Sequence, residues 1–296
     1  MGATRTSRQG RAQKAEGTGG TDLELLQGAV EVDLGAGIEA LRKATERFTS
    51  LVRNIEDPTA RTRGLDWSLA DTAAHVLLTV RYDLGTLQGT RQPYAVIDGD
   101  ILRSGTLHNA EMLRSEPERD PGKLADLIDE AIEEFIVEAQ RHDPRDSAPL
   151  AGGKAMTVAN LVGTILGEVI LHGYDIARTI GTQMQIDPGA ARLAVYATTA
   201  TLPLAVDERA TADLDVRLEM RIRGGEAFVV HIDYGAARTE PTGARADFYM
   251  SSDPLAYLLV GFGRSGPLRQ VLRGKMISWG RRPSLALKLP TFFRKP

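Results

Sequence analysis

Cysteine is absent from the 296-residue sequence, and histidine and tryptophan are scarce. The absence of cysteine excludes disulfides, cysteine-ligated zinc sites and a cysteine nucleophile. Any thiol chemistry therefore requires a thiol from outside the chain, and any metal must be held by His, Asp or Glu. Only five histidines have to be considered: His75, His108, His142, His172 and His231.

Long apolar runs and a strong charge of either sign are also absent. No apolar stretch reaches the roughly 20 residues that cross a bilayer, and the N-terminus has no hydrophobic signal segment. We therefore expect no membrane partner and a cytoplasmic location. The net charge of −3 gives no reason to expect nucleic acid binding. A hydrophobic content of 42% is ordinary for a globular protein, and the length suffices for two domains.

The chain is predicted to begin with a disordered basic tail and a helical domain. Residues 1–22 are rich in Gly and Arg and poor in large apolar residues, so we expect them to be disordered. Residues 23–205 repeat apolar residues at helical spacing, which is typical of a helical bundle. The predicted helices span 30–55, 68–88, 158–180 and 188–204, with another after Pro121 and a short one over 107–113 within an otherwise irregular 89–120.

The hydrophobic pattern changes near residue 213. Residues 214–222 alternate strictly between apolar and polar, as expected for a half-buried strand. A returning strand is predicted over 228–234, another over 246–250 and a short apolar helix over 254–262. A further strand and helix are expected before the C-terminus. Residues 206–296 are therefore predicted to form a small α+β domain.

Glu168 and His172 lie four residues apart in a predicted apolar helix, so they share a face. A buried Glu is costly without a partner, and a metal ion is one such partner. His75 is the natural third ligand, because facing helices of a bundle can direct side chains to one interior point. Two His and one Glu suit zinc or another divalent metal and leave a position open. The spacing also allows a core histidine at 75 and a simple hydrogen-bonded Glu168–His172 pair.

Two further side chains lie on the same helix faces. Asp175 is three residues past His172, and it is a candidate to orient that histidine or to act in catalysis. An ion pair between Asp175 and Arg178 is the alternative. Tyr82 lies seven residues after His75, where it either packs in the core or lines a pocket.

Two segments resemble the mycothiol-dependent maleylpyruvate isomerase family of DinB-like metalloenzymes. Residues 65–76, which include Trp67 and His75, resemble its histidine segment, and residues 167–181 resemble its helix with Glu168, His172 and Asp175. Residues 253–259 and 274–276 resemble the sterol-carrier-type module often fused to these bundles. The resemblance implies a DinB-like four-helix bundle followed by a small α+β sterol-carrier-like domain.

The resemblance also implies zinc ligation by His75, Glu168 and His172, with mycothiol as cofactor or cosubstrate. Zinc would favour the thiolate form of mycothiol, which attacks an electrophilic small molecule. Addition to a conjugated cis double bond, rotation and elimination would give a cis–trans isomerase. Displacement of a leaving group would give an S-transferase, and the ligands do not distinguish the two.

Arginines are the expected partners of a substrate carboxylate. Arg281 and Arg282, after a predicted turn at Trp279 and Gly280, are the candidates from the C-terminal domain, with a solvated surface pair as the alternative. Arg282 and Tyr82 are also candidates for cofactor binding. Two other functional classes stay open. One is a hydrolase with a zinc-activated water and Asp175 as general base; the other is a non-enzymatic binder of lipid or another small ligand.

Overall fold

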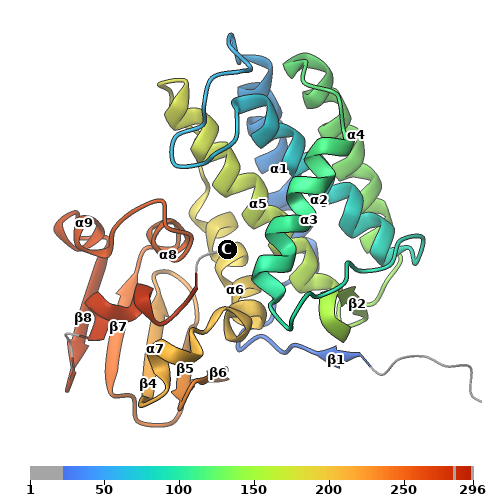
Figure 1. Ribbon diagram of the computed structural model, residues 1–296. Coiled ribbons are helices and arrows are strands. Elements are labelled where there is room, and N and C mark those ends of the chain that lie inside the picture. The colour runs from blue at the N-terminus through green and yellow to red at the C-terminus, as the bar shows by residue number, and fades with distance from the viewer. Residues whose placement is uncertain (1–22, 283–284, 295–296) are drawn as a thin grey trace, which may run out of the picture.

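A helical domain and a mixed α/β domain lie side by side in the computed structural model, which describes residues 23–282 and 285–294 (Figure 1). The predicted tail, residues 1–22, lies outside the described residues. Four helices pack on one another as the predicted bundle. They are α1 (Leu34–Arg53), α2 (Leu69–Leu87), α4 (Pro121–Ala139) and α5 (Val158–Thr179).

Each bundle helix begins at a side chain that caps it. The capping oxygen accepts a hydrogen bond from the backbone N–H three residues later, which satisfies one of the donors left open at a helix start. The caps are Asp33, Ser68, Asp120 and Thr157. Ser68 and Asp71 form a reciprocal capping box, as their spacing suggests. The inward faces are apolar, and fully buried side chains such as Phe48 and Phe135 each contribute roughly 1.5–3 kcal/mol.

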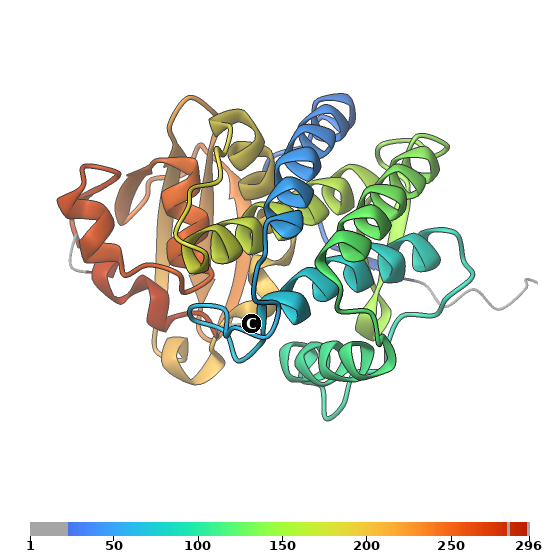
Figure 2. The same cartoon turned by 90° about the horizontal axis from the view of Figure 1, so that it is seen from above.

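The remaining helical-domain elements surround the bundle (Figure 2). Helix α3 (Ile101–Ser115) packs on α2 and is longer than the predicted 107–113, because it begins at the capping residue Asp100. Only Ser104, Met112 and Leu113 of this helix are buried, so its apolar pattern is weak. A small sheet of order β1-β3-β2 joins distant segments. Its strands are β1 (Glu24–Leu25), β2 (Ser147–Leu150) and β3 (Lys154–Thr157), with a 3-10 turn between β2 and β3.

The C-terminal domain is built on a five-stranded sheet of order β6-β5-β4-β7-β8, in which only β4 and β7 pair in parallel. Strand β4 alternates as predicted, with Val216, Leu218, Met220 and Ile222 buried. The strands are β4 (Asp215–Ile222), β5 (Ala227–Asp233), β6 (Ala236–Pro241), β7 (Phe248–Ser252) and β8 (Met276–Gly280). The helices are α7 (Glu208–Thr211), α8 (Pro254–Gly261), α9 (Pro267–Leu272) and α10 (Leu285–Lys288).

Two predictions for this domain need correction. The predicted turn at Trp279 and Gly280 is instead the end of β8, where Trp279 pairs and stacks with Tyr249 of β7. Strand β6 was not predicted, because an edge strand in contact with only one neighbour lacks the apolar alternation of an inner strand. The mixed α/β class of the domain is confirmed.

Helix α6 (Pro188–Thr201) joins the two domains, because it packs on α5 on one side and on α8 on the other. The end of the chain also returns to this junction: the N–H of Arg294 donates to the carbonyl of Ala205 at 2.7 Å. None of the helices in the described part of the chain is long and apolar enough to span a membrane.

Candidate metal centre

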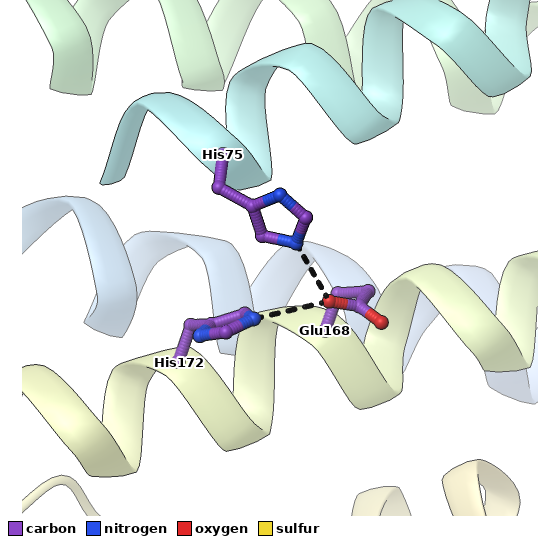
Figure 3. Close-up of side chains that lie close together, drawn as sticks. All are labelled: His75, Glu168 and His172. Atoms are coloured by element: carbon purple, nitrogen blue, oxygen red, sulfur yellow. Dashed lines mark ion pairs between the residues drawn. The ribbon is translucent and has the colours of Figure 1, made fainter. Parts of the chain in front are cut away.

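Helices α2 and α5 bring His75, Glu168 and His172 together inside the helical domain (Figure 3). The Nε2 atom of His172 lies 3.2 Å from Oε2 of Glu168, and Nε2 of His75 lies 3.5 Å from the same oxygen. The imidazole rings meet edge to face with centroids 5.0 Å apart. One ligand atom from each of the three residues lies within 4.8 Å of the others. The predicted convergence is therefore observed.

This side-chain set fits a divalent metal ion such as zinc. Both imidazoles direct Nε2 inward, and the Glu168 carboxylate has no arginine or lysine partner among the described residues. The histidine side chains are 7% exposed, whereas that of Glu168 is 26% exposed. Glu168 lines the large cavity described below, so the open side of the centre faces that cavity. His₂Glu with one open side is the donor set of a catalytic zinc site.

The protonation of the metal-free centre follows from the shared carboxylate. Burial alone would raise the pKa of Glu168, but the two imidazoles outweigh it and hold that pKa well below its ordinary value. Burial lowers the pKa of His75. Burial also opposes the charged form of His172, yet Asp175 and Glu168 together raise its pKa above the ordinary value. Of the two histidines, His172 therefore retains its proton to the higher pH, and a metal ion would have to displace that proton.

Asp175 lies behind His172, with its Oδ2 atom 3.6 Å from Nδ1 of that ring. Its ion-pair partner is Arg264, at 2.8 Å, which follows α8 in the C-terminal domain. The alternative of a pair with Arg178 is wrong, because the Arg178 guanidinium donates to the carbonyl of Arg63. The Asp175 side chain is 1% exposed. Asp175 can thus orient His172, while its burial keeps it from the cavity.

Trp67 covers the histidines from the other side. Its ring centroid lies 4.6 Å from that of His75 and 6.1 Å from that of His172. Gly173, the next residue after His172, also allows close packing, because a Cβ there would collide with the sulfur of Met184 and lie 3.3 Å from the Phe48 ring. The centre is therefore enclosed except on its cavity side.

A cavity of about 460 Å³ lies between the two domains. Helices α2, α3, α5 and α6 line it on one side, and strands β4, β5, β7 and β8 with α8 line it on the other. Tyr82 lines this cavity, as one of the two alternatives predicted, and its hydroxyl accepts a hydrogen bond from the N–H of Tyr94 at 2.9 Å.

Asp83 also lines the cavity and was not singled out in the sequence. It is 8% exposed, and no hydrogen-bond partner of its carboxyl group occurs among the described residues. Burial, with a smaller contribution from the charge of Glu168, raises its pKa to about 8. The available signal was its place eight residues after His75 on a largely apolar helix. Arg264 gave no such signal, because it lies in a loop of the other domain.

Arg281 and Arg282 lie away from this centre. Arg281 pairs with Asp247 at 3.1 Å with its side chain 64% exposed, and Arg282 is exposed as well. Neither lines the cavity. The surface alternative describes them better than a role in binding substrate or cofactor.

A second group of candidate metal ligands lies on the sheet of the C-terminal domain. Asp215, His231 and Asp233 approach one another on the paired strands β4 and β5. His231 Nε2 is 2.9 Å from the carboxylate of Asp215, and Arg238 pairs with Asp233 at 3.1 Å. The Asp215 side chain is 56% exposed.

Comparison with known proteins agrees with this architecture. A crystal structure of the mycothiol-dependent maleylpyruvate isomerase is 12% identical and has a TM-score of 0.51, over 80% of this chain and 91% of that chain. A mutant of that enzyme gives the same TM-score and identity over 79% and 90%. A structure of sterol carrier protein 2 is 21% identical over 32% of this chain and 88% of that chain, with a TM-score of 0.25. No curated protein matches the sequence.

The fold is thus a helical bundle joined to a mixed α/β domain, similar to that of the solved isomerase. Residues 41–177 match the family model described as the mycothiol maleylpyruvate isomerase N-terminal domain. The matched segment contains His75, Glu168, His172 and Asp175. The predicted resemblance to that family is therefore confirmed over these residues, and the solved isomerase structure shares the fold.

Proposed function

We propose that this chain is a zinc-dependent enzyme that uses mycothiol as a thiolate against an electrophilic small molecule. One observation carries the proposal: His75, Glu168 and His172 meet at the edge of a cavity in a chain that has no cysteine. The family of the helical domain, whose description names mycothiol, supports the choice of thiol. The lack of an internal thiol agrees with a sulfur nucleophile that comes from outside.

Each residue of the candidate centre has its own role in the proposed chemistry. His75 and His172 offer neutral nitrogen donors and Glu168 offers an anionic oxygen, and zinc held there would favour the thiolate form of a sulfur ligand at neutral pH. Asp175 keeps the His172 ring oriented, because it lies next to Nδ1 while Nε2 points to the centre. The largely apolar walls of the cavity exclude water and so strengthen the electrostatic interactions inside.

The two proposed reactions, isomerisation and S-transfer, begin with the same bond-forming step. The sulfur donates an electron pair to a carbon, and an S–C bond forms. In an isomerase the π electrons of a conjugated C=C move to the carbonyl oxygen, rotation follows, and their return breaks the S–C bond and releases thiol and trans product. In an S-transferase a leaving group departs with its bonding pair, and the sulfur stays on the product. The side chains of the centre serve both.

The hydrolase alternative has less support in the structure. A metal-bound water needs a general base within hydrogen-bond reach. Asp175 was the predicted base, but its side chain is enclosed, paired with Arg264 and absent from the cavity lining. The non-enzymatic alternative would leave the ligand set at Glu168 without a use.

Metal analysis combined with a thiol titration tests the proposal. We expect about one divalent metal ion per chain and saturable binding of mycothiol that requires the metal. A Glu168→Ala/His172→Ala double variant should lose both. His142→Ala is the matched control, because His142 forms a comparable i,i+4 pair with Glu138 at the surface and should keep both. Turnover that needs no thiol, or a metal-free protein with full activity, would contradict the proposal.

A further inference from the structure

The cavity between the domains has two chemically different walls. The wall from the helical domain carries polar side chains, including Thr79, Tyr82 and Asp83 of α2 and Asn109 of α3. The wall from the C-terminal sheet is apolar. Four adjacent strands place these side chains against the cavity: Met220, Val230, Met250 and Met276.

Methionine is concentrated at this site. The sequence has seven methionines, and five of them line the cavity, with Met112 and Met156 on the helical side and three on the sheet. Methionine is flexible and polarizable, so it adapts to irregular apolar ligands and adds little specificity for polar groups. Such a wall favours an apolar molecule over a hydrated one.

Positive charge is almost absent from the cavity. Of the described residues that line it, Arg294 alone carries a permanent positive charge, and its guanidinium pairs with Asp100 at 3.0 Å. The carboxyl groups of Asp83 and Glu168 are the acidic groups of the lining. A carboxylate ligand would thus leave water without an unpaired arginine or lysine as partner among the described lining residues, which is costly. Arg281 and Arg282, the predicted carboxylate partners, lie outside the cavity.

Asp83 gives the cavity a buried carboxyl group that has no hydrogen-bond partner among the described residues. It is 8% exposed and faces the lumen, and in its neutral form it has an O–H to donate. A buried polar group normally has a hydrogen-bond partner, so a ligand oxygen is a fitting acceptor. Asp83 and Glu168 line the same cavity, so one bound ligand can contact both this donor and the candidate metal centre.

From these features we propose that the electrophile is an uncharged, largely apolar molecule that packs against the methionines of the sheet wall, with one oxygen atom bound by Asp83. This inference rests on the proposed function, because it names the substrate class of the same site. It excludes dicarboxylates as preferred substrates of this chain. It also assigns the C-terminal domain a direct part in substrate choice.

A series of three maleate derivatives tests the inference on the full-length zinc-loaded protein. Dibutyl maleate is uncharged, monobutyl maleate carries one carboxylate and maleate carries two, while all three share the electrophilic double bond. Their affinities are measured without thiol, by displacement of the uncharged dye Nile red from the cavity. We expect dibutyl maleate to bind at least about tenfold tighter than monobutyl maleate, and maleate not to displace the dye. Equal or tighter binding of either anion would overturn the inference.

Two substitutions of Met250, one polar and one apolar, test whether the ligand binds against the sheet wall. Met250→Gln places an amide in the sheet wall and should weaken dibutyl maleate binding about tenfold, while Met250→Leu should keep it within about twofold. Asp83→Leu removes the donor and should also weaken binding, and circular dichroism and zinc content check the fold of each variant. Unchanged affinity in both Met250→Gln and Asp83→Leu would exclude this cavity as the binding site.

Thiol-dependent turnover separates this inference from the proposed function. With mycothiol added, thiol consumption above the spontaneous rate is measured for each of the three compounds. Tight binding of dibutyl maleate without catalysed thiol addition would refute the proposed function and leave the ligand class intact. Faster turnover of maleate than of dibutyl maleate would refute the ligand class and support the thiol chemistry.

Discussion

The two groups of candidate metal ligands, one in each domain, have similar residues and different surroundings. His75, Glu168 and His172 are enclosed by helices, and their carboxylate has no basic side chain as partner. Asp215, His231 and Asp233 lie on two neighbouring strands, where Arg238 pairs with Asp233 and Asp215 is exposed. Ion pairs and solvent already satisfy the second group. A metal ion would gain less there than in a site whose carboxylate depends on it.

Removal of a ligand from each group should break the comparison most clearly. His172→Ala should abolish stoichiometric zinc binding, with a loss of affinity greater than about a hundredfold, because two ligands do not fill a zinc site. His231→Ala is the matched substitution in the second group and should keep one zinc per chain. The measurement is zinc content after dialysis, with a competitive chelator for affinity. Loss of zinc in His231→Ala with retention in His172→Ala would reverse the assignment.

The carboxylate beside Nδ1 of the histidine also differs between the two groups. Asp175, beside His172, is 1% exposed, whereas Glu240, beside His231, is 27% exposed. Asp175→Asn should weaken zinc binding about 10–100-fold, since a residue that orients a ligand contributes that much. Arg264→Met keeps Asp175 and should have a smaller effect on zinc affinity. Unchanged zinc affinity in Asp175→Asn, together with a lower melting temperature, would make the Asp175–Arg264 pair a link between domains and not a positioning device.

The pH dependence of zinc binding sharpens the same contrast. Asp175 and Glu168 raise the pKa of His172 above its ordinary 6.5, so the metal-free protein keeps a proton there to a higher pH than an ordinary histidine does. This proton stabilises the metal-free fold, fully so below the ordinary pKa of 6.5. The contribution is lost as the pH rises through the raised pKa of His172. Zinc must displace the proton, so its affinity should fall about tenfold per unit as pH drops below that pKa. Isothermal titration at several pH values measures this.

Asp175→Asn is the control for the pH experiment. Asp175 is one of the groups that raise the pKa of His172, so the fall in zinc affinity should begin at lower pH in the variant. A profile that is flat between pH 6 and 8 in the wild type would show that His172 is neutral before zinc binds.

Asp83 should affect the stability of the metal-free protein and not its affinity for zinc. Its pKa of about 8 means that the folded state keeps a proton that the unfolded state loses above roughly pH 4. The free energy of unfolding should therefore fall between about pH 4 and 8. Asp83→Asn should remove this fall and be about 2–5 kcal/mol more stable than wild type at pH 8, with little difference at pH 4. Urea unfolding at each pH measures it.

Asp66→Asn is the matched control, because the Asp66 side chain is 93% exposed. Its unfolding free energy should follow that of the wild type at every pH. Parallel curves for Asp83→Asn and wild type would show that Asp83 ionises freely in the folded protein.

Local patterns in the sequence predict the candidate metal ligands and most of the helices and strands, because both depend on the spacing of residues along the chain. Glu168 and His172 share a helix face, and the apolar flanks of His75 indicate a buried helix. Contacts between domains are different. Arg264 reaches Asp175 across 89 residues of sequence, from a loop with no periodicity, so no pattern announces it. The methionines of the cavity likewise look like ordinary core residues until the two walls face each other.

The place of Trp67 has a practical consequence. The chain has two tryptophans, and Trp279 stacks on Tyr249 at the edge of the sheet, whereas Trp67 lies 4.6 Å from the His75 ring and 6.1 Å from that of His172. A change of charge or ligation at these rings alters the environment of the Trp67 indole. A Trp279→Phe protein would therefore carry one native fluorophore beside the centre. Its emission can follow metal loading and thiol arrival in real time without an added label.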